Sequence, residues 1–252
     1  MRVLDINQGG EEWLEYRKGK SGGSAFGKLY KVNGRTNETL KDQFFVMLAE
    51  RVARPMTPND YLDRMPEGIT FSWAVRGHIL EPEAAKAFEM ETGLILDDGK
   101  VWASDYDPSS YVSPDRVIKS SDGKIREAVE IKCLSSEKVL KIWWERRQMK
   151  EGQSDFIALP SNEYQAQAIK YFMVNDDLET LYWVVYTDLI PKLELQILKI
   201  RRTDISALIE DAKGVEMMYL ATLDRAEEIL EDEDDMPTNA EINDLTDMGY
   251  GG

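Results

Sequence analysis

Two short motifs on either side of a turn signal constrain most strongly what this chain can fold into. Ser113-Pro114-Asp115 precedes the dipeptide Asp122-Gly123, and Glu130-Ile131-Lys132 follows it. Asp-Gly between alternating apolar residues is among the strongest local signals for a β-hairpin. If Asp122 and Gly123 are the two turn residues, Asp115 lies directly opposite Glu130, because both are equally far from the turn. Residues i and i+2 of a strand share a face, so Lys132 projects on the same side as Glu130. The spacing therefore predicts two carboxylates and an amine on one patch of sheet.

This grouping suits the metal-dependent hydrolysis of a phosphodiester. Such a reaction needs an activated water and neutralisation of developing negative charge, which a pair of divalent cations about 4 Å apart can supply. Mg²⁺ takes hard oxygen ligands and retains several waters, so a few carboxylates and a main-chain carbonyl suffice. We expect Asp115, Glu130 and the Ile131 carbonyl to hold the metal. Lys132 is expected to orient the attacking water or help deprotonate it, and its charge to offset that of the phosphate. Glu81, in an otherwise apolar helical turn, is the expected third carboxylate.

Each of these residues also has a purely structural interpretation. An Asp after Ser-Pro commonly forms a turn, and Glu-x-Lys on a strand commonly forms a solvated face. The catalytic interpretation rests on three features together: the hairpin register, the shared face, and the apolar Val129 and Ile131 that anchor the strand.

Composition limits the class of protein. A chain of 252 residues can bury a full core, and we expect a single nuclease domain over residues 1–230 with an acidic, disordered tail over 231–252. There is no apolar run long enough to span a membrane, and the residues that begin with Met1–Asp5 lack the apolar h-region expected of a signal peptide. One cysteine, Cys133, and one histidine, His78, cannot form a Cys/His zinc site. We therefore expect a cytoplasmic protein whose metal, Mg²⁺ with Mn²⁺ as a substitute, is bound by oxygen.

The net charge of −16 is concentrated near the C-terminus and does not exclude nucleic acid as a ligand. Residues 204–252 carry fifteen acidic side chains against two basic ones, which leaves residues 1–203 at −3. Local basic clusters in this nearly neutral body can then contact phosphates. The acidic tail itself has three interpretations: a solvating terminus, a docking peptide for a recombination partner, or a DNA mimic that covers a basic channel.

The pattern of apolar residues and of helix and turn signals predicts an α/β or α+β fold, with a central mixed β-sheet flanked by helices. The expected helices are 11–18, 36–53, 72–91, 135–149, 160–174 and 204–230, and the expected strands are 93–96, 100–104, the hairpin 111–132, 181–187 and 193–199. Pro82 lies inside the third helix and predicts a kink or a break there, and Gly93 is its stop signal.

The chain resembles the phage lambda exonuclease family, also called YqaJ-like viral recombinases, within the PD-(D/E)xK nuclease superfamily. The resemblance covers residues 8–200 and rests on motifs in the family's order. These are Gln8-Gly9, Trp13, Arg17-Lys18-Gly19, Ser24, Arg76-Gly77 with Glu81, Ser113-Pro114-Asp115, Glu130-Ile131-Lys132-Cys133 and Tyr164-Gln165-Ala166-Gln167. It implies a restriction-endonuclease-like core. The family's second motif glutamine is replaced by Ile169, Gly22-Gly23 replaces its usual approach to the serine, and residues 55–68 and the tail lie outside the resemblance.

The resemblance implies a Mg²⁺-dependent 5′→3′ exonuclease on double-stranded DNA ends, which leaves 3′ single-stranded tails for phage-type homologous recombination. It also implies a homo-oligomer, often a trimeric ring. We expect a single-strand annealing protein as a recombination partner. The matching positions in this sequence are Glu81, Asp115 and Glu130 as metal ligands, Lys132 as the catalytic lysine, Gln167 as the motif glutamine, and Arg17 and Ser24 around the terminal 5′-phosphate. For Arg17 a surface ion pair, and for Ser24 a loop or capping role, remain the alternatives.

A basic segment follows the second motif and is a second candidate for contact with DNA. Lys138, Lys141, Arg146 and Arg147 could follow a phosphate backbone, and Trp143 and Trp144 could stack at a duplex end or pack into the core or a subunit interface. Two other functions remain open from sequence: a restriction or repair endonuclease, and a non-catalytic DNA-binding module on the same fold.

Overall fold

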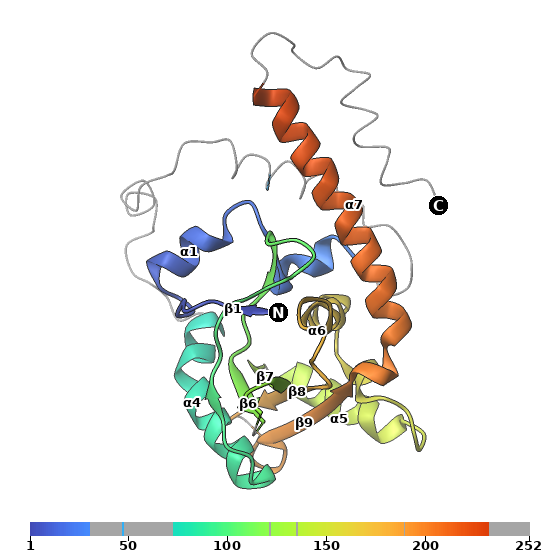
Figure 1. The fold of residues 1–252 in the computed structure, drawn as a ribbon. Helices are drawn as coiled ribbons and strands as arrows, with labels where there is room; N and C mark the ends of the chain where they lie inside the picture. The colour runs from blue at the N-terminus through green and yellow to red at the C-terminus, as the bar shows by residue number, and fades with distance from the viewer. Residues whose placement is uncertain (31–46, 48–72, 121, 135, 189, 232–252) are drawn as a thin grey trace, which may run out of the picture.

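The computed structural model describes residues 1–30, 47, 73–120, 122–134, 136–188 and 190–231 (Figure 1). Three predicted regions lie outside the described residues: the helix over 36–53 (except Met47), the 55–68 segment, and the tail from residue 232. The described elements, in chain order, are β1 (Arg2–Val3), α1 (Glu11–Arg17), β2 (Ser21–Gly22), the 3-10 helix η1 (Gly23–Lys28), α4 (Trp73–Thr92), β3 (Asp97–Asp98), β4 (Trp102–Ala103), β5 (Ser110–Val112), β6 (Arg116–Lys119), β7 (Ile125–Cys133), α5 (Ser136–Gln148), η2 (Asp155–Ala158), α6 (Asn162–Val174), β8 (Thr180–Tyr186), η3 (Pro191–Leu193), β9 (Leu195–Arg201), η4 (Arg202–Asp204) and α7 (Ser206–Glu231).

Two mixed sheets organise this part of the chain. The larger has the order β3-β6-β7-β8-β9, with β7 and β8 parallel and the other neighbours antiparallel, and the smaller has the order β1-β4-β5-β2. Together with the helices they confirm the predicted mixed sheet flanked by helices. No helix in the described ranges combines the length and the apolar character needed to cross a bilayer.

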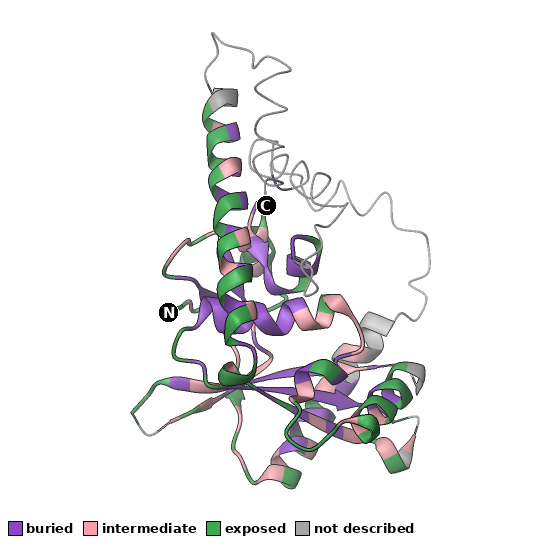
Figure 2. Ribbon diagram, turned by 90° about the vertical axis from the view of Figure 1, so that its right-hand side faces the viewer, coloured by how far each residue is buried: buried purple, intermediate pink, exposed green. Residues whose placement is uncertain are grey.

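Side chains of β7 and β8 alternate between two apolar layers, as expected for strands covered on both faces. Val129 and Ile131 pack with Leu80, Ala84 and Phe88 of α4 on one face. On the other face Ala128 and Trp183 pack with α6. Because α6 is buried from Ala166 to Val174, between this sheet and α7 (Figures 1 and 2), the polar side chains of this stretch must find partners inside the protein.

The hairpin keeps the predicted register through a turn that differs from the predicted one. Arg116 pairs with Val129, so the next position places Asp115 opposite Glu130. A two-residue type I′ turn needs positive φ at both central residues, but only Gly123 has one, at +78°, and Asp122 does not.

The loop is instead a longer one that ends in the left-handed Gly123, whose N–H donates to the Ser120 carbonyl at 2.9 Å. Lys119 consequently pairs with Ile125, and an irregularity between Ile118 and Lys119 restores the register further along the strands. The prediction of a two-residue turn was wrong. The predicted register is nevertheless correct from Ile118 to Arg116, because the β-bulge offsets the extra loop residue.

Helix α4 runs without interruption through Pro82, so the helix does not break there. Proline removes one backbone hydrogen bond, but Leu80 before it and Ala84 and Phe88 after it all pack on the sheet, and this packing holds both halves. The predicted stop signal is confirmed: Gly93 has φ +72° and donates its N–H to the Glu89 carbonyl at 2.8 Å.

Candidate active site

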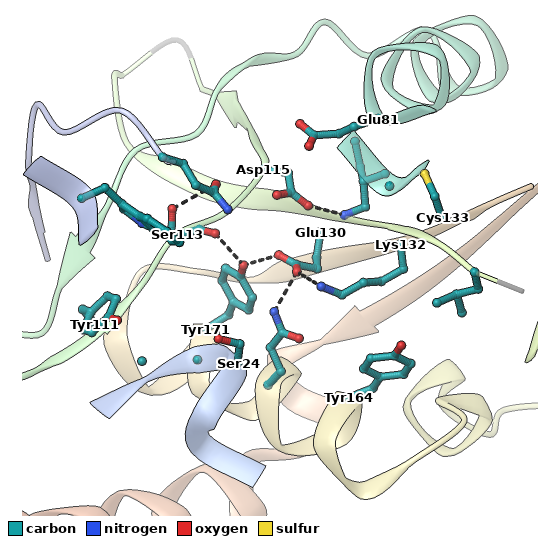
Figure 3. A pocket seen from close by; sticks show the side chains of 18 of the residues that line it. Ser24, Glu81, Tyr111, Ser113, Asp115, Glu130, Lys132, Cys133, Tyr164 and Tyr171 are labelled. Atoms are coloured by element: carbon teal, nitrogen blue, oxygen red, sulfur yellow. Dashed lines mark hydrogen bonds and ion pairs between the residues drawn. The ribbon is translucent and has the colours of Figure 1, made fainter. Parts of the chain in front are cut away.

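A pocket of about 610 Å³ opens where the hairpin, α6 and the N-terminal segment meet (Figure 3). It brings together residues that are far apart in the sequence. Its walls include nine of the predicted site residues: Arg17, Ser24, Glu81, Asp115, Glu130, Ile131, Lys132, Lys138 and Gln167. The spacing argument and the resemblance therefore indicate the same place in the fold.

Glu130 is the most firmly held side chain of the pocket. It is 3 % exposed, and its Oε1 accepts hydrogen bonds from Lys132 Nζ at 2.5 Å and Gln167 Nε2 at 2.7 Å. The Tyr171 hydroxyl donates to Oε2. Burial and the charge of Glu130 raise the pKa of Tyr171 well above its usual value, so this hydroxyl keeps its proton and acts as a donor.

Asp115 lies next to Glu130 and is fixed by the neighbouring strand. Its Oδ2 accepts the backbone N–H of Ile131 at 2.6 Å. Burial, then the charge of Glu130, raises the pKa of Asp115 well above its usual value, against the opposing effects of Lys132 and this hydrogen bond. Two carboxylates that repel each other in a buried site form a hard oxygen donor set, which fits Mg²⁺ because a divalent cation would offset the repulsion.

Glu81 reaches the pocket from α4, but its carboxylate is engaged elsewhere. Arg116 Nη1 lies 2.9 Å from Glu81 Oε1 and also donates to the Asp115 carbonyl at 2.6 Å. Across the described ranges, no group of three or more His, Cys, Asp or Glu side chains is arranged as a metal centre. Glu81 as the third ligand therefore stays a prediction, and one of its carboxylate oxygens is bonded to Arg116.

Lys132 projects from β7 on the same side as Glu130, as the spacing predicts. Desolvation of its ammonium group works against the charged form, but the charges of Glu130 and Asp115 prevail and the pKa of Lys132 is raised. Lys132 therefore holds its proton in this arrangement. It can donate hydrogen bonds and supply positive charge rather than accept a proton.

The opposite wall of the pocket contains the residues expected around a 5′-phosphate. Arg17 Nε donates to the Tyr111 hydroxyl at 3.2 Å, and its guanidinium carbon lies 4.3 Å from the centre of the Trp13 ring. Ser24 is exposed in η1, in the wall of the same pocket. A Cβ on Gly22 would lie 2.6 Å from the Tyr111 hydroxyl oxygen, so the glycine permits a contact that a side chain would block.

The family profile of the YqaJ-like viral recombinase domain matches residues 12–177. The chain belongs to this family. No curated protein sequence matches it.

Three solved structures of exonucleases share the fold of this YqaJ-like chain. The alkaline exonuclease LHK-Exo from Laribacter hongkongensis is 20 % identical, with a TM-score of 0.65, over 88 % of this chain and 96 % of its own. Its complex with dAMP gives 21 % identity and a TM-score of 0.63 over the same shares. A phage-related exonuclease from Haemophilus somnus 129PT is 13 % identical, with a TM-score of 0.50, over 79 % of this chain and 92 % of its own. These similarities confirm the predicted fold class.

The basic helix α5 of this YqaJ-like domain reaches the pocket only at its start. Lys138 lines the pocket, with its Nζ 5.6 Å from the centre of the Tyr164 ring. Lys141 donates to the Pro160 carbonyl at 3.3 Å, Arg146 bonds Asp155 at 3.1 Å, and Arg147 lies over Trp143 at 4.7 Å.

Trp144 is 57 % exposed on α5, so of the alternatives for the two tryptophans, packing into the core does not hold for Trp144. Its ring lies in the stretch of α5 that carries Lys141 and Arg147, and the other interpretations, a contact with DNA or with another subunit, stay open for this surface.

Sequence reasoning missed Tyr171, although a signal for it was present. Tyr164, Gln167 and Tyr171 follow at helical spacing, so they share one face of α6. That face looks into the pocket, and Tyr171 there takes a hydrogen-bonding position on Glu130 beside Gln167 (Figure 3).

Proposed function

We propose that this chain is a divalent-metal-dependent DNA exonuclease that degrades double-stranded ends in the 5′→3′ direction. The 3′ single-stranded tails that it leaves would serve phage-type homologous recombination. The observation that carries the proposal is the convergence of Asp115, Glu130 and Lys132, with Glu130 held by Gln167 and Tyr171. Membership of the YqaJ-like family and the exonucleases of the same fold support it.

Asp115, Glu130, the Ile131 carbonyl and Glu81 would hold Mg²⁺, or Mn²⁺ in its place. When bound, the ion supplies an activated water and neutralises charge on the phosphate. The protonated Lys132 donates hydrogen bonds toward the reacting phosphate and offsets its charge. Gln167 and Tyr171 keep the Glu130 carboxylate in one orientation, so that the site is ready before substrate enters.

The other wall of the pocket would determine which end is bound. Arg17 and Ser24 offer donors that suit the dianion of a terminal 5′-phosphate. Lys138, at the far side of the pocket, would contact the following backbone, and Lys141, Arg146 and Arg147 would extend this contact along α5. We further propose, on the family resemblance, a ring-shaped homo-oligomer around the DNA, a single-strand annealing protein as partner, and the host cytoplasm as location.

The direct test is digestion of linear duplex labelled at either the 5′ or the 3′ end, with Mg²⁺, Mn²⁺ or EDTA. With Mg²⁺ or Mn²⁺, we expect a 5′ label to be released at once as mononucleotide and a 3′ label to persist in a single strand. With EDTA, we expect both labels to stay in intact duplex. Lys132→Ala is the control for contaminating nuclease and should be inactive.

Two outcomes would replace this proposal. Cleavage of covalently closed circular duplex would indicate an endonuclease. DNA binding without degradation of any substrate in Mg²⁺ or Mn²⁺ would indicate a non-catalytic binding module.

A further inference from the structure

A buried ion pair joins α6 to α7 beside the pocket but outside it. Lys170 and Glu216 are both 0 % exposed, and Lys170 Nζ contacts Glu216 Oε1 directly. Lys170 Nζ also donates to Ser110 Oγ at 2.6 Å, and Ser110 Oγ donates to Glu216 Oε2 at 3.1 Å. The Tyr106 hydroxyl donates to the same oxygen at 2.5 Å. Both charged groups therefore have several partners in the interior.

Stability alone does not account for this pair. Removing two charges from water is costly, and well-packed apolar residues of similar volume often serve stability as well or better. Burial lowers the pKa of Lys170 in spite of the nearby Glu216, which reflects that cost. Hydrogen-bonded charges differ from apolar side chains in being directional, and Lys170 can satisfy its donors only while α6, α7 and β5 keep one relative placement.

Three elements that carry residues of the pocket meet at Lys170. On α6, Gln167 lies one turn earlier and Tyr171 is the next residue. On β5, Ser110 pairs with Ser21 of β2, and the Gly22-Gly23-Ser24 segment follows directly.

The 3-10 helix η1 also touches this lysine. Lys170 Nζ lies 5.0 Å from the centre of the Phe26 ring, and a Cβ on Gly23 would lie 3.7 Å from Lys170 Cγ and 3.8 Å from Gln167 Cγ. The side chain of Lys170 thus connects α6, which holds Glu130, with η1, which carries Ser24.

We propose that the Lys170–Glu216 pair positions α6 against β5 and η1. The pair thereby sets the distance between the Glu130 carboxylate and the pocket wall that contains Arg17 and Ser24. Lys170 and Glu216 are positioning residues, since neither lines the pocket. The effect on catalysis rests on the proposed function, whereas the effect on the placement of η1 does not.

The test is the double variant Lys170→Met/Glu216→Leu, which removes both charges and leaves neither one unpaired. The Tyr106 and Ser110 hydroxyls keep each other as partners at 2.6 Å. We expect an unchanged or higher thermal midpoint, because apolar packing replaces the pair. We expect kcat to fall about 10- to 100-fold, since a displacement of about 1 Å in a catalytic site can cost that much.

Two further readouts separate positioning from a merely structural role. The ratio of rates on 5′-phosphorylated and 5′-hydroxyl ends should fall toward one, because Ser24 and Arg17 would no longer be matched to the catalytic carboxylates. Amide hydrogen exchange should become faster in Gly23–Lys28 and in α6. The matched control is Tyr30→Phe/Asp211→Leu, which removes another link to α7 (a 2.9 Å hydrogen bond) that does not involve α6. It should leave the ratio unchanged.

A stable double variant with wild-type kcat and an unchanged rate ratio would overturn the proposal. If the double variant does not fold, Ser110→Ala decides, because it keeps the ion pair and removes only the hydrogen bonds of the Ser110 hydroxyl, which join β5 to Lys170, Glu216 and Tyr106. An unchanged ratio in Ser110→Ala would then count against positioning. If the wild-type chain has no nuclease activity, the proposed function fails but hydrogen exchange still decides: faster exchange in η1 supports positioning, and unchanged exchange rejects it.

Discussion

The Asp115 carboxylate accepts the backbone N–H of Ile131 at 2.6 Å, at the point where the backbone pairing of β6 with β7 ends. A side chain thus continues the hydrogen bonding of the hairpin for one more position and holds this carboxylate beside Glu130. The Asp115 carbonyl in turn accepts the N–H of Gly99 at 3.1 Å. The position of Asp115 therefore depends both on β7 and on the segment that follows β3.

Gly99→Ala should disturb Asp115 without changing any pocket residue. A Cβ at position 99 would lie 1.7 Å from the Pro114 carbonyl oxygen, so the backbone before Asp115 must move. We expect a loss of about 1–3 kcal/mol in unfolding free energy, typical of overpacking, together with at least about a tenfold loss of nuclease rate. Denaturant unfolding and initial rates measure the two effects.

Gly214→Ala is the matched control for this prediction. Nothing lies within 4 Å of a Cβ at position 214 in α7. We expect this variant to gain about 0.5–1 kcal/mol, because alanine is the better helix former, and to keep wild-type activity. A Gly99→Ala protein with a wild-type rate would show that Asp115 does not depend on this loop.

Tyr171→Phe should weaken the response to metal while the fold persists. The ring is buried and phenylalanine fills the same volume, but the hydrogen bond to Glu130 is lost. Removing a partner that orients a metal ligand typically costs about 10- to 100-fold in metal affinity. Activity measured across Mg²⁺ concentrations should show a half-maximal point shifted by that factor. Tyr30→Phe, which loses a hydrogen bond to Asp211 away from the pocket, should show no shift.

Local patterns in the sequence were enough to predict the core of the site. The hairpin register depends on residues close together in the chain, and strand alternation then places Lys132 beside Glu130. The register was right even though the turn was wrong, because the buried faces of β6 and β7 determine the pairing and the bulge adapts to it. Helical spacing could also have predicted Tyr171, because it follows Gln167 by four residues on α6 and therefore lies on the same face.

Contacts between distant segments could not be predicted in this way. The parallel pairing of Glu130 with Trp183 joins strands separated by α5, η2, α6 and their loops. The ion pairs Glu81–Arg116 and Lys170–Glu216 join charges whose partners are decided by packing, and no local period encodes that choice. An ionisable residue on a buried helix can be recognised from sequence, but its partner cannot.

The hairpin tip should show an acid-dependent contribution to stability. Hydrogen bonds from Arg126, then Ser120 and the Lys124 backbone N–H, hold the pKa of Asp122 below its ordinary value of 3.8. A depressed carboxyl pKa contributes stability above the ordinary pKa, and this contribution is lost as pH falls through the folded-state pKa. Wild type should therefore be more stable than Asp122→Asn at pH 7, and the difference should shrink below pH 4. Thermal midpoints across pH measure it, and an Arg126→Gln background should reduce it at every pH.

The basic side chains of α5 should contribute unequally to DNA binding. Lys138 faces the pocket, whereas Arg146 is engaged by Asp155 at 3.1 Å. Each phosphate contact contributes about 0.9 to the slope of log affinity against log salt concentration. Binding of duplex DNA in EDTA should lose about that much slope in Lys138→Ala, and clearly less in Arg146→Ala. Equal losses would mean that DNA follows the whole helix rather than its first turn.

The last prediction concerns which DNA ends are degraded. Arg17 lies in the pocket wall with Ser24. The guanidinium group bonds the Tyr111 hydroxyl through Nε, and this bond does not use its two terminal nitrogens. A hydrogen bond to a charged group is worth about 1.5–3 kcal/mol, which corresponds to a factor of about 10 to 160 in rate. Arg17→Ala should therefore lower kcat/KM on 5′-phosphorylated ends by that factor and leave 5′-hydroxyl ends within about twofold. Lys18→Ala is the matched control, because Lys18 pairs with Glu15 and does not line the pocket. Equal losses on both kinds of end would place Arg17 outside the recognition of the phosphate.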